Sequence, residues 1–439
     1  MRSVWLTAAV LLAVPHLQLQ AQARRPATTP LATTTTLALE TGNNTSAVRG
    51  SPENGNVDPG NVSKLSLHSL LYPHAITKIY VRYMPWFGDP KHRDVGYRSD
   101  DPSAIARQVQ DMMSRGIDGA IVDWYGAGDK FKNRCTELLL TEAERRGFSL
   151  AISVDKGTLK NCESKRGCNV TQELIAAMRY VNEHFARSPA YVRVNGRPLM
   201  TFFGLEHSDI DWGRARRSVP GNPLLLFRNS EAFKLEYGDG AFSWIAPETV
   251  KPGDARGFQY LERFHKAARE NPRKFVMASV YKGFDNRLAD WGKGRKIAQD
   301  CGRTWLGSFR EVNGFYSEQR QLPALIIPTW NDYEEGTEIE TGIDNCVKVE
   351  ASIRGTRLHW EVDGPKETID HFTVFASQDG RNLAAIADSP SDGKDLDLSA
   401  IRLGPGEYTI FVKAVAKPSL LNHMSNPVLA KIGKENKIE

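Results

Sequence analysis

The chain lacks several patterns that would assign it to a common class at once. No segment beyond the N-terminal 23 residues is long and apolar enough to cross a bilayer. Charge of one sign is not concentrated either, because 57 basic and 52 acidic residues are interspersed and leave a net charge of only +5. No Gly-rich phosphate or dinucleotide loop follows any predicted strand. Stable membrane insertion, nucleic-acid binding and nucleotide binding are therefore not expected.

Metal-ligand and nucleophile motifs are missing as well. His74, His92 and the acidic residues show no two-His metal spacing. Ser153 and Ser279 lie within predicted strands, but neither sits in a Gly-x-Ser-x-Gly elbow. The sequence therefore predicts no metal site and no cofactor. It also disfavours activity as an esterase or polysaccharide deacetylase.

Cysteine is scarce, with five residues in a chain of 439. Cys162 and Cys168 lie close together in a polar loop and are predicted to form a disulfide. The odd number leaves one cysteine unpaired if disulfides form. Such usage is compatible with an exported protein.

The N-terminus carries the signal expected of export. Residues 4–14 are apolar, and Ala-Gln-Ala at 21–23 matches the small-x-small pattern cut by a signal peptidase. We predict a signal peptide at 1–23, with an uncleaved anchor as the alternative, and a disordered Thr/Pro/Asn-rich spacer at 24–64. The protein is then secreted, either extracellular or periplasmic.

The sequence does contain a repeated alternation of apolar runs and amphipathic segments. Eight runs are typical of strands buried on both faces: 79–84, 119–122, 149–154, 198–203, 224–227, 242–245, 275–280 and 324–327. Helical spacing of apolar residues, such as Ile105, Val109 and Met112, separates several of them. About 270 residues in eight repeats match a (β/α)8 TIM barrel, whose usual size is ~250 residues. We predict this α/β barrel at 65–345, with a doubly wound open sheet as the alternative fold.

A different pattern begins at Cys346. Short alternating segments, such as 347–351, 358–362, 372–376 and 408–415, predict a small all-β sandwich over 346–439. Trp360 in an early strand, and LGPGEY at 403–408 before a late one, resemble the pattern of the immunoglobulin-like fibronectin type III domains. That resemblance implies a tyrosine corner at Tyr408. We assign no catalytic role to this region.

Carboxylates and aromatic residues gather at the predicted strand ends. In a TIM barrel the C-terminal ends of the strands converge on one pocket, so residues there are candidates for chemistry. Flat apolar faces beside hydrogen-bonding carboxylates suit sugar rings, which predicts a carbohydrate substrate. The predicted substrate-binding residues are Trp86, Trp124, Tyr125, Asp155, Trp244, Tyr281, Trp330, Asn331 and Tyr333.

The predicted catalytic residues are Glu335 and Asp332, which follow the eighth strand, and Asp123, which follows the second. Glycoside hydrolysis commonly uses two carboxyls, one of which protonates the leaving oxygen. If the loop turns helically, positions three apart share a face, and a like-charged neighbour raises the pKa of a general acid. The alternative is that these acids cap helices or pair with arginines on the barrel rim.

Several motifs are similar to known glycoside hydrolases. TWNDY at 329–333 followed by Glu335 resembles the strand-eight signature of glycoside hydrolase family 71, the endo-α-1,3-glucanases. EGTEIE at 335–340 is similar to family 99, the endo-α-mannosidases, and YMPWF at 83–87 and GIDGAIVDWYG at 116–126 resemble the first two strands of this group. The resemblance implies a barrel and endo-acting attack on α-linked glycans.

The resemblance also implies roles for the strand-eight acids. Glu335 corresponds to the general acid/base of the mannosidase-like family, and Asp332 to a glutamate that assists the sugar 2-hydroxyl as an internal nucleophile. Asp332 is one methylene shorter than that glutamate, and catalytic positioning is demanding. A mechanism that uses another carboxylate, such as Asp123, therefore stays open.

The sequence as a whole predicts a secreted, cofactor-independent glycoside hydrolase that acts as a monomer. Its expected substrate is an α-linked polysaccharide or glycan of the α-1,3-glucan or α-mannan type. The alternative from a different class is a non-catalytic glycan-binding protein with a decayed barrel site. Binding without release of products would favour that alternative.

Overall fold

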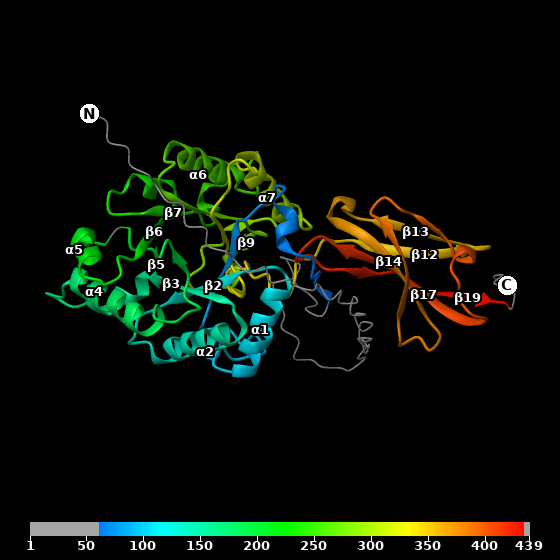
Figure 1. Ribbon diagram of the computed structural model, residues 1–439, viewed down its shortest axis with the longest axis horizontal. Coiled ribbons are helices and arrows are strands. Elements are labelled where there is room, and N and C mark those ends of the chain that lie inside the picture. Colours follow the sequence, from blue (N-terminus) through cyan, green and yellow to red (C-terminus); the bar gives the residue numbers. More distant parts are fainter. Residues whose placement is uncertain (1–60, 207, 434–439) are drawn as a thin grey trace, which may run out of the picture. The chain divides into compact units, whose positions relative to one another are not determined.

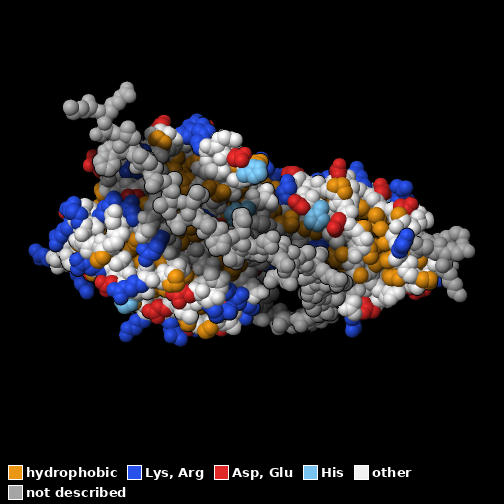
Figure 2. All heavy atoms as spheres, in the orientation of Figure 1, with side chains coloured by type: hydrophobic (Ala, Val, Ile, Leu, Met, Phe, Trp, Pro, Cys, Tyr) orange, Lys and Arg blue, Asp and Glu red, His pale blue; other side chains and the backbone are white. Residues whose placement is uncertain are grey.

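The computed structural model of the protein describes residues 61–206 and 208–433. The predicted signal peptide, and the predicted spacer up to residue 60, lie outside these ranges. Within the described residues no helix has the length and apolar character needed to cross a bilayer. Acidic and basic side chains are interspersed over the face shown in Figure 2, in keeping with the balanced composition.

Eight parallel strands close into a barrel, as predicted (Figure 1). They are β1 (Lys78–Tyr83), β2 (Gly119–Trp124), β3 (Ser149–Asp155), β5 (Arg197–Phe203), β6 (Leu224–Arg228), β7 (Gly240–Phe242), β8 (Phe275–Ser279) and β11 (Ala324–Ile327). Sequential strands are neighbours, β11 pairs with β1, and β3 pairs with β5. The doubly wound open sheet is therefore wrong for this chain. A short antiparallel strand, β4 (Arg193–Val194), pairs with β5.

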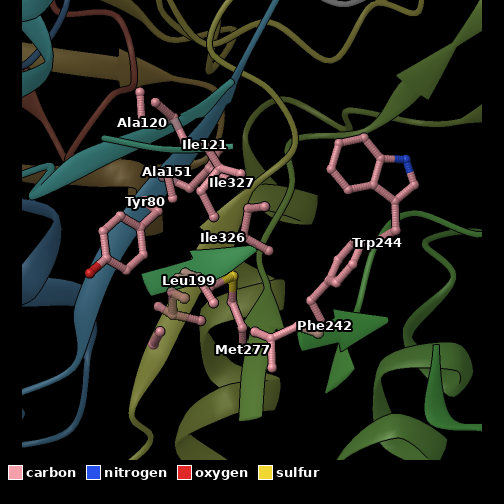
Figure 3. Close-up of a cluster of buried hydrophobic side chains, with 14 of the residues drawn as sticks. Tyr80, Ala120, Ile121, Ala151, Leu199, Phe242, Trp244, Met277, Ile326 and Ile327 are labelled. Atoms are coloured by element: carbon pink, nitrogen blue, oxygen red, sulfur yellow. The ribbon is translucent and has the colours of Figure 1, made fainter. Parts of the chain in front are cut away.

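The barrel interior is a packed apolar core. In the register of the strands, Tyr80 of β1 lies opposite Ile326 of β11 and Gly119 of β2. Figure 3 shows how Ile121, Ala151 and Met277, which come from three different strands, gather with Ile326 in one buried cluster. A filled interior leaves room for a cavity only at the ends of the strands.

Helices surround the strands (Figure 1). The longer ones are α1 (Pro102–Ser114), α2 (Lys130–Arg146), α4 (Val170–Tyr180), α6 (Phe258–Glu270) and α7 (Arg303–Phe315), and the shorter ones are α3 (Lys160–Glu163) and α5 (Trp212–Arg217). Asp101, Asp129 and Asn169 cap α1, α2 and α4 by accepting a backbone N–H. The alternation is irregular in two places, because a 3-10 helix (Ser230–Lys234) follows β6 and no helix separates β11 from the next strand.

The sixth barrel strand ends earlier than the predicted 242–245, since β7 covers Gly240–Phe242. Ser243 still donates its N–H to the Met277 carbonyl (3.0 Å), but the N–H of Trp244 bonds to the Tyr260 hydroxyl (2.8 Å) instead of a strand. The chain leaves the sheet at this point. Trp244 can thus point into the space above the strand ends (Figure 3).

Two antiparallel sheets follow the barrel strands. One contains β12 (Lys348–Arg354), β13 (Arg357–Asp363) and β16 (Asp395–Asp397), and the other contains β14 (Ile369–Ser377), β15 (Ala384–Pro390), β17 (Gly406–Ala416), β18 (His423–Met424) and β19 (Val428–Ile432). Trp360, Phe372 and Val412 belong to the core that these sheets share. The Tyr408 hydroxyl donates to the Gly404 carbonyl (3.0 Å), as a tyrosine corner requires. The fibronectin type III assignment stays a prediction.

Two disulfides form among the five cysteines. Cys162 pairs with Cys168, as predicted, and Cys301 pairs with Cys346, a pair that the sequence analysis did not assign. Cys135 is buried and unpaired.

Candidate active site

The loop after β11 is held firmly against the end of β1. Asn331 is fully buried and imitates a strand partner, because its Oδ1 accepts from Met84 N (2.8 Å) and its Nδ2 donates to the Met84 carbonyl (3.1 Å). Thr329 and Thr337 close the loop through a backbone hydrogen bond (3.1 Å) and a contact between their hydroxyls (2.9 Å). The residues between them are thereby fixed in place.

Asp332 and Glu335 project from this loop into one cavity. Asp332 Oδ1 accepts the backbone N–H of Glu334 (3.1 Å) and of Glu335 (2.9 Å), so the carboxylate itself stabilises the turn. Both side chains line a cavity of about 650 Å³, together with Asp123 from the end of β2 and Asp155 from the end of β3. This places the cavity at the C-terminal ends of the barrel strands.

Burial sets the protonation of this pair. It raises the pKa of Asp332 well above its usual range, and the charge of Glu335 raises it further, while the two backbone N–H groups oppose the shift. Burial also raises the pKa of Glu335, the charge of Asp123 adds to the rise, and the Trp291 indole N–H opposes it. Neighbouring buried carboxyls resist losing both protons, so the pair retains one more readily than separate acids would.

Asp123 has both of its oxygens occupied. Oδ1 is bound by the Arg82 guanidinium, and Oδ2 accepts from the Tyr125 hydroxyl (2.7 Å). Asp123 and Arg82 are nearly fully buried, and Arg82 also donates to the Ser153 hydroxyl. A carboxylate held in this way is a poor nucleophile, but it supplies a fixed negative charge to the cavity.

Asp155 lies beside this ion pair. Burial and, next, the charge of Asp123 raise the pKa of Asp155 to about 7. Its Oδ1 accepts the N–H of Gly157 (2.6 Å) and so caps the 3-10 helix that follows β3. Asp155 therefore has a structural contact as well as a place in the cavity wall.

Aromatic rings form part of the cavity wall. Trp86 stacks on His92 with ring centroids 4.3 Å apart, and Trp291 meets Trp86 edge to face at 6.2 Å. Trp244 packs against Phe203 with centroids 5.1 Å apart. Of the predicted subsite residues, the structure brings Trp86, Tyr125, Asp155 and Trp244 to this cavity.

Trp124 and Trp330 do not line the cavity and are fully buried elsewhere. Alternate residues of a strand point to opposite faces, so Asp123 faces the cavity while Trp124 faces the helices and stacks on Tyr180 (5.7 Å). Trp330 lies beneath the Arg115 guanidinium, 4.9 Å from its ring centroid. The prediction that these two rings are sugar platforms is not supported.

Tyr281, Asn331 and Tyr333 also lie outside the cavity lining. The Tyr281 hydroxyl is buried and donates to the Arg256 carbonyl (2.9 Å), and the Tyr333 hydroxyl donates to Glu340 (2.8 Å). The side-chain amide of Asn331 is hydrogen-bonded to the backbone N–H and carbonyl of Met84. These three residues are buried and bond to other parts of the protein, and their assignment to substrate binding stays a prediction.

Several lining residues were not assigned to the site from the sequence. They are Met84, Arg82, His92, Lys132, Phe203, Arg228, Glu248, Asn286, Trp291 and Arg295, among others. Arg82 had a recognisable signal, because it is the one charged residue in the interior of the otherwise apolar and aromatic run IYVRY. Trp291 had none, since it lies far along a polar segment after β8.

Among the described residues, no group of three or more His, Cys, Asp and Glu side chains is arranged to hold a metal ion. The fold and the site together define a parallel eight-stranded barrel with a cavity at the C-terminal ends of its strands, and this cavity is lined by carboxyl groups, basic side chains and aromatic rings.

Comparison with known proteins finds only remote likenesses. No family model matches the chain, and no curated protein matches it. Among solved structures, the chain is similar to the GH99 endo-α-mannosidase of Bacteroides thetaiotaomicron in complex with bis-tris-propane, with 19% identity over 60% of this chain and 86% of that one and a TM-score of 0.48. A second structure of that enzyme has 18% identity, coverage of 60% and 87%, and a TM-score of 0.47. A glycoside hydrolase-like protein has 12% identity, coverage of 60% and 86%, and a TM-score of 0.43. Likenesses of this degree carry no argument about activity.

Proposed function

We propose that the protein is a glycoside hydrolase that cleaves an α-linked polysaccharide or glycan of the α-1,3-glucan or α-mannan type. The observation that carries this proposal is that Asp332 and Glu335 open into one cavity beside aromatic rings. Paired carboxyls are the usual means of glycoside hydrolysis, and aromatic faces suit the C–H faces of sugars. The resemblance of segments 329–333 and 335–340 to families 71 and 99 supports the same reaction.

Glu335 is the proposed general acid/base. Its raised pKa lets the carboxyl keep a proton at a pH where an exposed glutamate has lost it. A protonated carboxyl at the cavity wall can protonate the departing glycosidic oxygen, and the resulting carboxylate can then take a proton from water. This role requires Glu335 to hold a proton while Asp332 is ionised.

Asp332 is the proposed anionic partner. Burial and the charge of Glu335 raise the pKa of Asp332, so its anionic form in this proposal depends on the two backbone N–H groups that its Oδ1 accepts, which oppose that rise and fix its orientation. It could act on the sugar 2-hydroxyl or directly at the reacting carbon. Asp123, tied to Arg82 and Tyr125, is proposed to support the pair electrostatically and not to attack.

The domain organisation and the export of the protein are also proposed. We propose a catalytic barrel at 65–345 and a fibronectin type III-like accessory region at 346–439. The protein is proposed to be exported after removal of the predicted signal at 1–23, and two disulfides fit an oxidising compartment. It is also proposed to act as a monomer.

A panel of polymers tests the proposed function. Purified protein is incubated with α-1,3-glucan, α-mannan and related polymers, and new reducing ends and product masses are followed. Internal cleavage of an α-linked polymer is the expected result. Tight binding to one of them without any shortened product would instead establish the non-catalytic glycan-binding alternative.

A further inference from the structure

Trp291 stands apart from the other large apolar side chains of the site. It is 48% exposed, whereas Trp86 and Trp244 are nearly buried, at 4% and 6%. It nevertheless lines the cavity that holds Asp332 and Glu335. Nearly half of the surface of this indole side chain is therefore exposed at the cavity wall.

The segment that carries Trp291 is a hairpin excursion after β8. Its two short strands, β9 (Phe284–Asp285) and β10 (Lys296–Ile297), are antiparallel to each other. Asp285 N donates to the Glu335 carbonyl (2.8 Å), and Asn286 Oδ1 accepts from Arg295 N (2.9 Å). The hairpin is therefore tied to the loop of the catalytic pair, and Trp291 holds a defined place over it.

Trp291 also contacts the reacting group itself. Its Nε1 lies 3.4 Å from Glu335 Oε1, and its ring meets Trp86 at 6.2 Å and His92 at 6.1 Å between centroids. The indole N–H thus faces the proposed general acid, and the same side chain lines the cavity.

We propose that Trp291 forms a sugar-binding subsite next to the cleaved bond and that its indole N–H positions Glu335. A sugar ring packs its C–H face on the exposed indole, so binding of substrate and orientation of the acid depend on one side chain. The positioning of Glu335 by the indole rests on the proposed glycosidase function. The sugar-binding subsite can be tested without turnover.

The pH behaviour of Glu335 follows from its surroundings. The charged side chains that face it are Asp332 and Glu334 from its own loop, Asp123 from β2 and Arg228 from β6, with Lys293 and Arg295 of the hairpin in the same cavity wall. The Trp291 N–H favours the ionised form of Glu335 and so lowers its pKa. Loss of the N–H raises that pKa, and the form that can donate a proton then persists to higher pH.

Two substitutions separate the platform from the N–H donor. Trp291→Phe keeps an aromatic face and removes the donor, so the alkaline limb of the kcat/KM profile should move to higher pH, with KM changed less than about twofold. Trp291→Ala removes both and should raise KM about tenfold, as expected for loss of one aromatic contact. The control is Leu288→Ala, which removes a neighbouring exposed side chain (45% exposed) that does not line the cavity and should leave both parameters unchanged.

Binding is measured separately in the Glu335→Gln background, which needs no turnover. Oligosaccharides of α-1,3-glucan and α-mannan are titrated by isothermal calorimetry, which needs no signal from Trp291 itself. The proposal expects at least one of them to bind, about tenfold more weakly after Trp291→Ala and equally well after Leu288→Ala. Equal affinity in the Trp291→Ala protein, or no binding of either oligosaccharide, would overturn the subsite. If binding depends on Trp291 but no polymer is cleaved by the unmodified protein, the subsite stands and the glycosidase proposal fails.

Discussion

At the residue scale, burial decides how the carboxyls of the cavity ionise. The pKa of Asp155 is raised to about 7, far above that of an exposed aspartate, so the folded protein binds a proton that the unfolded chain releases at lower pH. The free energy of unfolding contributed by this group therefore falls as pH rises from about 4 to about 7, and is constant above that range.

Asp155→Asn tests whether this carboxyl lowers the free energy of unfolding as pH rises. The amide cannot ionise and can still accept from Gly157 N, so the cap is retained. The free energy of unfolding of the variant, relative to that of the unmodified protein, should increase by about 3 kcal/mol between pH 4.5 and pH 8. Urea unfolding at the two pH values measures the difference. A difference independent of pH would contradict the raised pKa.

At the element scale, the loop after β11 depends on one side chain for its position. Asn331 joins this loop to β1 through two hydrogen bonds to Met84, and it is fully buried. Asn331→Ala leaves the backbone N–H and carbonyl of Met84 without these partners, and each buried unsatisfied group costs about 1–3 kcal/mol.

We expect Asn331→Ala to lower the free energy of unfolding by about 3 kcal/mol. It should also reduce kcat, because the proposed catalytic pair loses its fixed position. The matched control is Asn313→Ala, which removes an exposed hydrogen bond to the Leu70 carbonyl and should cost less than about 0.5 kcal/mol. Denaturant unfolding of both variants is the measurement. Equal losses would mean that the Asn331 bonds do not hold the loop.

The same elements show how far the sequence could predict the site. The apolar runs and the acids at their ends were enough to place Asp123, Asp155, Asp332 and Glu335 at one rim, because strand ends of a barrel converge. Aromatic residues were less predictable. Trp124 comes directly after Asp123, and the two-residue repeat of a strand turns it to the opposite face.

Residues from irregular segments could not be predicted at all. Trp291 reaches the cavity only because the excursion after β8 folds into a hairpin, and nothing in its polar sequence indicates where that hairpin lies. The early end of β7 has the same origin, since the bond from Trp244 N to the Tyr260 hydroxyl joins residues of different elements.

At the scale of the whole molecule, the two disulfides should differ in their effect on stability. Cys301 and Cys346 are 45 residues apart in sequence, and Cys162 and Cys168 are 6 apart. A longer closed loop restricts the unfolded chain more. Cys301→Ser/Cys346→Ser should lower the free energy of unfolding by about 4 kcal/mol, and Cys162→Ser/Cys168→Ser by about 2 kcal/mol. Chemical unfolding of the two double variants compares them, and a larger loss for the shorter loop would contradict the chain-entropy argument.

The barrel as a whole was the most predictable feature. All eight strands were found from apolar runs alone, because strands buried on both faces carry little polar sequence. The connection after β6 was harder to predict, because it contains a 3-10 helix and no α-helix. The antiparallel sheets were indicated by alternation, but the second disulfide, which joins Cys301 to Cys346, depends on a proximity that no sequence pattern reports.

The proposed reaction depends on the proton held by Glu335. Glu335→Gln keeps the shape of the side chain and removes the proton that it donates, while Glu318→Gln makes the same change at an exposed position before β11, at the opposite end of the barrel strand. The measurement is kcat on the most rapidly cleaved α-linked polymer for both variants, with circular dichroism to verify the fold. We expect kcat to fall at least about 100-fold for Glu335→Gln and to stay within twofold for Glu318→Gln. A folded Glu335→Gln protein with unchanged kcat would contradict the assignment.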